Sequence, residues 1–358
     1  MAEMFTFRMR AHAAAHFEWN DLLTATWLDT EAKFQSEYTG GDDGRAYPVT
    51  IHGEIRGEGA SLNEAEPRLA GAISSVLPIL ALAANAAIAD PLAVAAHGLD
   101  LTNPQPFRGY RTPHADEWFP PGKRRFNIEA TLALVEAVGR HPQSDLLHRC
   151  VEAYRRALTH WVPEQRLMAG EFLFIAAETL SRFLIESRAA SHGMTPKNLA
   201  QLLKAGSQDA LSEQYLKAEI FAGDDEAREA MEEASNGFEH GYMSVDQVRG
   251  LMEPVLERAM GHVRAALVAA SGATSEMAGR LLADNYAEPR GLIPENHFRD
   301  RAVASGRHGA AAPRRAQHHS RVGVEQTRGG GHSCRERRSH PRLPDGRETG
   351  GTSTQHDS

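Results

Sequence analysis

Apolar and polar residues alternate along several segments in the first third of the chain, which is the period of a half-buried β-strand. Phe5, Phe7 and Met9 follow this period. The same alternation recurs on both sides of residues 40–44, whose Gly and Asp residues are a strong turn signal. The pattern therefore predicts a strand near the N-terminus and a β-hairpin over 31–56.

An apolar segment follows the hairpin. Residues 69–89 carry no charged side chain, and a helix of 21 residues is long enough to cross a bilayer. The segment is rich in Ala, however, and Ser74, Pro78 and Asn85 interrupt it, so its transfer into lipid is only weakly favourable. We expect a buried core helix. A membrane-associated protein anchored by this segment is the alternative.

The next residues complete the N-terminal region. Residues 91–101 predict a further strand, and five prolines between 103 and 123 predict an irregular stretch. We therefore expect a mixed α+β domain over 1–123.

From Asn127 onward the apolar period becomes that of amphipathic helices. Asn127 is expected to cap a helix over 128–139, and Ser144 to cap a helix that ends near Trp161. The most apolar predicted helix of this half spans 164–188.

Two later helix starts have capping signals. Thr195 and Pro196 predict a helix whose inner face carries Leu199, Leu202 and Leu203. Ser244 to Gln247 form a capping-box pattern that predicts a helix to about Ala270. Residues 127–271 are therefore expected to form an all-α bundle, so the fold class is α+β.

The C-terminal residues differ in composition. After a C-terminal extension over 272–296, residues 297–358 contain only five bulky apolar residues. Such a segment cannot bury enough apolar surface to offset the entropy lost on ordering, so we expect a disordered Arg/Gly/His-rich tail. A basic arm for nucleic acid or anionic lipid is the alternative.

The formal net charge of −8 is unevenly distributed. Residues 297–358 hold twelve Arg, no Lys and six acidic residues, a balance of +6. Subtraction leaves 27 basic and 41 acidic residues in 1–296, a balance of −14. An acidic body disfavours RNA or DNA as a partner, because nucleic-acid binding usually needs a positive surface.

Composition excludes several classes of protein. Two cysteines exclude a disulfide framework and a Cys-rich zinc module, and His332, Cys334 and His340 are too sparse for a zinc site. No phosphate-binding Gly-rich loop, hydrolase elbow or zinc-protease helix occurs, so no cofactor or metal is expected. With 34 Arg against 5 Lys and no leader-like N-terminus, we expect a bacterial, cytoplasmic protein.

Two carboxylates interrupt the apolar helix at 164–188. Glu171 and Glu178 are seven residues apart, nearly two turns, and so share about the same face. A carboxylate among apolar neighbours needs a partner or a proton. Glu178 could orient a catalytic or binding group across the bundle. The alternative is a glutamate at the edge of the apolar face that reaches solvent or an Arg.

A second candidate site is the stretch from Ser235 to Gly241, which we place between an acidic helix over 224–233 and the helix that begins at Ser244. His240 is flanked closely by Gly and is suited to proton transfer near neutral pH. Asn236 could hydrogen-bond this His or a phosphate. A surface or capping role for His240 is the alternative.

Three short stretches carry a family resemblance. They are YRRAL at 154–158, GEFLFIAAETL at 170–180 and NGFEHG at 236–241. With the order of helices over about 145–271, they resemble the HEPN superfamily of small α-helical bundles, in particular its ApeA-like branch. The whole of 1–296 also resembles a group of uncharacterised actinobacterial proteins, and this second resemblance implies no activity.

The HEPN resemblance implies a metal-independent RNase site in active members. Such members carry an Arg that holds the scissile phosphate, usually with an Asn directly after it. A His four residues beyond the Asn assists attack of a ribose 2′-hydroxyl. Asn236 and His240 fit this pattern, but Ser235 stands at the Arg position and supplies no positive charge.

The missing Arg favours a protein without catalysis, because phosphoryl chemistry needs positive charge against the phosphate. We therefore expect a HEPN-like binding or dimerisation module, in a defence or stress response, with a second copy or another protein as its partner. The alternative is a metal-independent RNase that uses His240 and Asn236, with Glu178 orienting a basic group.

Overall fold

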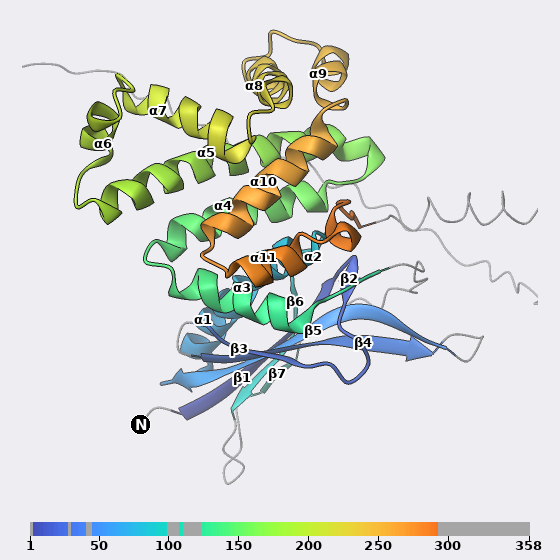
Figure 1. Cartoon of the computed structure of the whole chain (residues 1–358). Coiled ribbons are helices and arrows are strands. Elements are labelled where there is room, and N and C mark those ends of the chain that lie inside the picture. The colour runs from blue at the N-terminus through green and yellow to red at the C-terminus, as the bar shows by residue number, and fades with distance from the viewer. Residues whose placement is uncertain (1–2, 28–29, 41–44, 99–106, 110–122, 293–358) are drawn as a thin grey trace, which may run out of the picture. The chain divides into compact units, whose positions relative to one another are not determined.

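A computed structural model of the chain describes residues 3–27, 30–40, 45–98, 107–109 and 123–292, all within one compact unit. An antiparallel sheet forms one layer of this unit, and helices stack above it (Figure 1). The α+β fold class is therefore confirmed. Residues 41–44 of the predicted turn, the tail that was predicted to be disordered and most of the proline-rich stretch lie outside the described residues.

The main sheet has the strand order β3-β4-β5-β1-β6-β7, and every neighbouring pair is antiparallel. Its strands are β1 (Glu3–His12), β3 (Leu23–Trp27), β4 (Thr30–Gly40), β5 (Ala46–Gly59), β6 (Leu92–Gly98) and β7 (Phe107–Gly109). A separate parallel pair joins β2 (Ala15–His16) to β8 (Arg124–Arg125). The predicted N-terminal strand, the hairpin over 31–56 and the strand after residue 91 are confirmed.

Burial follows the alternation of the strands. Phe5, Phe7 and Met9 point into the core, while Arg8 and Arg10 lie on the other face of β1. Helix α1 (Leu62–Ser74) packs on the apolar face. It approaches β5 so closely that a side chain at Gly53 would collide with Met9 and Ile73.

The apolar segment forms two helices. A single helix over 69–89 was expected, but α1 begins after the cap at Ser61 and ends at Ser74, and α2 (Leu77–Ala84) follows. All eight residues of α2 are buried. The stretch Leu62–Ala84 is long and apolar enough to cross a membrane, but 67% of its most apolar window is buried inside the protein. The expectation of a buried core position is confirmed.

The helical layer begins after Phe126. Its longer helices are α3 (Ile128–Arg140), α4 (Ser144–Thr159), α5 (Arg166–Ser191), α8 (Asp225–Glu239) and α10 (Leu256–Ala270). Its shorter elements are η1 (Pro163–Gln165), α6 (Pro196–Leu202), α7 (Gln208–Tyr215), η2 (Leu216–Ile220), α9 (Val245–Met252), α11 (Ser275–Leu281) and η3 (Asp284–Tyr286).

Three predicted caps are confirmed. The side chains of Asn127, Thr195 and Ser244 each accept a hydrogen bond from a backbone N–H in the first turn of the helix that follows, and Ser244 forms the predicted capping box. The cap predicted at Ser144 is wrong, because Ser144 is already the first helical residue and Gln143 occupies the cap position without a side-chain bond.

Two further helix predictions need correction. The helix predicted from Ser244 to Ala270 is two helices, α9 and α10, since Pro254 lies between them and cannot donate a helical hydrogen bond. Leu199 is buried as expected, but the prediction of an inner face that also includes Leu202 and Leu203 is wrong, because Leu202 is exposed at the last residue of α6 and Leu203, its C-cap, is exposed as well.

A buried polar network joins the sheet layer to the bundle. Asn85, the fully buried C-terminal cap of α2, accepts from the Tyr154 hydroxyl at 2.7 Å and donates to the Tyr286 carbonyl at 2.9 Å. Arg264 and Arg124 donate to carbonyls at the end of α2. The regions predicted as separate domains, 1–123 and 127–271, therefore share one hydrophobic core, which is continuous across them.

Candidate functional site

The predicted site stretch lies mostly on a helix. We expected Ser235 and Asn236 in a connection, but α8 continues to Glu239 and includes both. His240 is the C-cap of α8, where its backbone N–H donates to the Asn236 carbonyl. Both Asn236 and His240 are exposed, so the structure brings these two residues to one end of α8.

Ser235 is buried, and its hydroxyl donates to Glu171 Oε2 of α5 at 2.9 Å. The side chain of Glu171 is also buried, with 6% of the residue exposed, and its Oε1 has no hydrogen-bond partner among the described residues. Burial raises the pKa of Glu171, the bond from Ser235 opposes this rise, and the nearby charge of Glu239 adds to it. Ser235, which stands where the resemblance would place an Arg, therefore forms a buried hydrogen bond that joins α8 to α5.

Glu178 lies two turns further along α5 and is exposed at the surface. Partial burial raises its pKa, Arg182 one turn away lowers it, and the charges of Glu239 and Glu232 raise it again. No hydrogen bond joins its carboxylate to Asn236 or His240 within the part of the chain that the structure describes. Its predicted role in orienting a catalytic group stays a prediction.

The cations around α8 are held by carboxylates. Arg228, considered as a substitute for the missing Arg, is buried, and it bonds Glu232 at 2.6 Å and Glu229 at 3.1 Å. Arg249 pairs with Asp246 and Glu253. These ion pairs leave the site acidic, which is unfavourable for holding a phosphate.

The same surface carries exposed apolar side chains. Phe238, Tyr242 and Val245 are 40%, 61% and 51% exposed, and they occupy the end of α8 and the start of α9. A side chain at Gly237 would collide with Met243, so the turn between the helices is tightly packed against α8. Figure 1 shows α8 and α9 at the end of the bundle farthest from the sheet. Exposed aromatic residues in such a place are typical of protein interaction sites.

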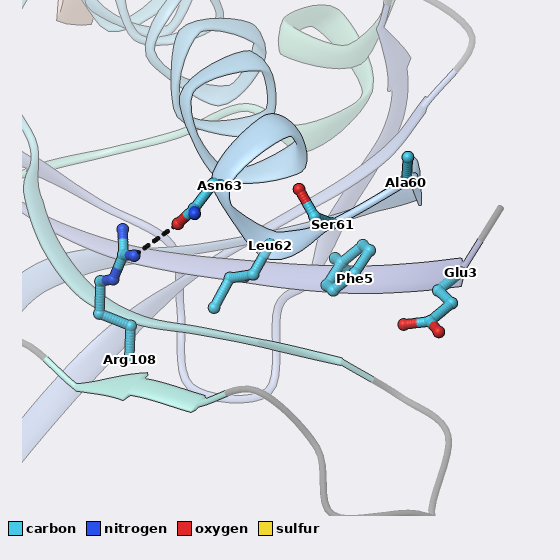
Figure 2. A pocket seen from close by; sticks show the side chains of 7 residues that line it. All are labelled: Glu3, Phe5, Ala60, Ser61, Leu62, Asn63 and Arg108. Atoms are coloured by element: carbon cyan, nitrogen blue, oxygen red, sulfur yellow. Dashed lines mark hydrogen bonds between the residues drawn. The ribbon is translucent and has the colours of Figure 1, made fainter.

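A shallow pocket lies elsewhere, at the start of α1 (Figure 2). Its volume is about 440 Å³, and Glu3, Phe5, Ala60, Ser61, Leu62, Asn63 and Arg108 line it. The Arg108 guanidinium already donates to Asn63 at 2.9 Å and pairs with Glu66. The nearby helix N-terminus and cation therefore do not form a free anion site.

One feature of the site was missed from the sequence. The charges of Glu232 and Glu239 both raise the pKa of Glu178, but Glu239 was not expected on the same helix as Glu232, because the acidic helix was predicted to end at residue 233. Had the helix been extended, their seven-residue spacing would have placed both on one face, like Glu171 and Glu178.

The described residues contain no group of three or more His, Cys, Asp or Glu side chains that could hold a metal ion. In comparisons with known proteins, the chain matches no protein-family model, no curated protein and no solved structure.

Proposed function

We propose that this protein is a HEPN-like protein of the bacterial cytoplasm that acts without catalysis, as a binding or dimerisation module in a defence or stress response. The observation that carries this proposal is the buried Ser235–Glu171 hydrogen bond at the position where the family pattern requires Arg. A short neutral side chain there cannot reach a phosphate or offset its charge.

Electrostatics supports the same conclusion. An attacking 2′-hydroxyl and a scissile phosphate develop negative charge, which an active site must stabilise with nearby donors or cations. Here the charge of Glu239 raises the pKa of both Glu171 and Glu178, and Arg228 is already held by Glu229 and Glu232. The surface would repel RNA rather than bind it.

The binding role is supported by the apolar residues beside this site. Phe238, Tyr242 and Val245 expose large side chains at a tightly packed turn, so a partner would meet a preformed surface. A second copy of the chain is the simplest partner, since most soluble oligomers are symmetric homo-oligomers.

Sedimentation equilibrium of the full chain between about 1 and 100 µM tests this role, a range that covers dimers with dissociation free energies near 8 kcal/mol. We expect a concentration-dependent dimer that Tyr242→Ser weakens at least tenfold. Leu202→Ser is the matched control, because Leu202 is equally exposed at 61% but lies on α6. A monomer at every concentration, or equal weakening by both variants, would contradict dimerisation through this surface.

A further inference from the structure

Helix α6 ends in a strained turn. Lys204, the residue after its C-cap, has a left-handed backbone with φ 56°. The Lys204 N–H donates to the Gln201 carbonyl at 3.1 Å, and the Ala205 N–H donates to the Ala200 carbonyl at 2.9 Å. This pair of bonds is the Schellman arrangement, whose left-handed position is usually glycine because a side chain is strained there.

Other helices of the bundle end in the same way but with glycine. Gly193 closes α5 through the same pair of hydrogen bonds, with φ 63°. Gly241 and Gly272 are the left-handed residues after the C-caps of α8 and α10. Lys204 therefore carries backbone strain that glycine would avoid, and what it adds in exchange is an exposed ammonium group.

Two large apolar side chains lie exposed beside this ammonium group. Leu202 and Leu203 directly precede Lys204, and they are 61% and 39% exposed. The inner side of the same helix is packed, because Leu199 and Ala200 are buried in a small core shared by α5, α6 and α7. We call Leu202, Leu203 and Lys204 the α6 tip. Figure 1 shows α6 at one end of the bundle, beside the C-terminal end of α5.

The segment around the α6 tip is positively charged. Residues 187–208 contain no Asp or Glu, and Arg188, Lys197 and Lys204 give them a balance of +3. The body as a whole is acidic, with 41 acidic against 27 basic residues in 1–296. Lys197 and Lys204 are exposed and form no ion pair within the part of the chain that the structure describes. Arg188 donates to the neutral Tyr215 hydroxyl at 3.1 Å, and this bond leaves its charge in place.

An anionic lipid surface matches both kinds of side chain. Its acyl region takes up leucine side chains, and its headgroups attract lysines, whose long stems let the ammonium stay at headgroup level. A nucleic acid would attract the lysines but leave the leucines in water, and residues 187–208 contain no Phe, Trp or Tyr on which bases could stack.

The acidic remainder of the body does not prevent such contact. At physiological ionic strength, exposed charges farther than about 8 Å from the lipid surface are largely screened. The charges of the segment that touches the surface therefore decide the attraction, and around the α6 tip these are positive.

We propose that the α6 tip docks the protein on membranes that contain anionic phospholipids, with Leu202 and Leu203 inserted below the headgroups and Lys197 and Lys204 against them. This docking is peripheral, since the apolar stretch Leu62–Ala84 stays mostly buried inside the protein. The inference goes beyond the proposed binding role, because it concerns α6 rather than the turn between α8 and α9, and it holds whether or not the protein dimerises.

Co-sedimentation of the full chain with large unilamellar vesicles tests this docking. One set of vesicles contains phosphatidylglycerol with phosphatidylcholine, and the other contains phosphatidylcholine alone. We expect binding to the second set to be weaker by about tenfold or more, since each lysine near an anionic surface contributes about fivefold. Residues 297–358 also carry excess positive charge, so variants of the α6 tip decide which part of the chain binds.

Lys204→Gly separates docking from folding. Glycine relieves the left-handed strain, so the variant should unfold at or above the wild-type temperature, but it should bind the anionic vesicles about fivefold more weakly. Arg149→Gln is the matched control. It removes one positive charge from an exposed side chain of α4 that forms no ion pair among the described residues, and it should bind like the wild type.

Leu202→Ser tests the apolar half of the tip and should weaken binding about tenfold, because a leucine no longer enters the acyl region. Its control is Leu22→Ser, at a leucine that is 48% exposed directly before β3. Equal binding by the wild type, Lys204→Gly and Leu202→Ser would overturn the proposal and assign the binding to another part of the chain. A loss in Lys204→Gly without a loss in Leu202→Ser would also overturn it, in favour of a polyanion such as RNA. So would a wild-type chain that sediments with neither set of vesicles.

Discussion

The hydroxyl of Ser235 donates a 2.9 Å hydrogen bond to the buried carboxylate of Glu171, joining α8 to α5 at the centre of the candidate site. The bond satisfies one oxygen of Glu171 and leaves the other without a partner in the described chain. Under the proposed HEPN resemblance an RNase would need a cation at position 235, and Ser235 is a neutral hydrogen-bond donor.

Ser235→Ala should destabilise the fold, because it leaves the buried Glu171 carboxylate with no hydrogen-bond donor. A buried polar group that loses its partner costs about 1–3 kcal/mol. Chemical denaturation followed by circular dichroism measures this loss. Ser191→Ala is the control: Ser191 is exposed and bonds only its own helix, so its removal should change stability by less than about 0.5 kcal/mol. Equal effects of the two variants would contradict a special role for Ser235.

The raised pKa of Glu171 predicts a pH dependence with a definite sign. The folded state binds this proton more tightly than the unfolded chain, whose ordinary Glu pKa is 4.5. The free energy of unfolding therefore falls as the pH rises from below 4.5 through the raised folded pKa of Glu171. Glu171→Gln keeps an acceptor for Ser235 and removes the charge, so its stability should fall less across this window. Denaturation at several pH values, with the exposed Glu58→Gln as control, tests this; an unchanged slope in Glu171→Gln would contradict it.

Substitution of Arg264 should lower the stability of the fold more than Ser235→Ala does. Its side chain is 2% exposed and donates to four backbone carbonyls, those of Leu82, Ala83, Leu281 and Tyr286. Arg264→Leu leaves these carbonyls without that donor, at about 1–3 kcal/mol for each one left unsatisfied. We expect a thermal unfolding midpoint far below wild type, while Arg140→Leu, at a side chain 78% exposed, should unfold near the wild-type temperature. Similar midpoints would show that the network contributes little.

Two glycines give a matched pair. Gly291→Ala would push a methyl group into the backbone carbonyl of Trp161, so it should destabilise the C-terminal segment. Gly279→Ala meets no atom within 4 Å on helix α11 and should stabilise the protein by up to about 1 kcal/mol, the helix-propensity gain. Thermal unfolding of both variants is the measurement. A stabilising Gly291→Ala would show that the contact with Trp161 is not as close as the structure has it.

The sequence predicted most of the local structure where capping residues and alternation were strong. Asn127, Thr195 and Ser244 begin helices as expected, and the strand through Phe5 and Met9 is in place. Strand β3 was missed, although Leu23, Ala25 and Trp27 alternate with polar residues, because the run is only five residues long.

The candidate site was only partly predictable. Glu171 and Glu178 were singled out by their place in an apolar helix, but the contact from Ser235 depends on how α8 packs on α5, which no local pattern encodes. The network around Asn85 was likewise invisible, because its partners Tyr154 and Tyr286 are distant in sequence. Helix ends fray and are the least certain part of any sequence-based assignment. The acidic helix was therefore predicted to stop at residue 233, whereas α8 continues to Glu239.

The central claim is that the protein does not cleave RNA, and a cleavage assay tests it most directly. The full chain, shown to be folded by circular dichroism, is incubated with single-stranded RNA and a chelator. The control is His240→Ala, because the side chain of His240 is exposed and forms no hydrogen bond or ion pair within the described residues. We predict no cleavage by the full chain above the level of His240→Ala. Cleavage that survives the chelator and is abolished in His240→Ala would contradict the claim and establish the RNase alternative.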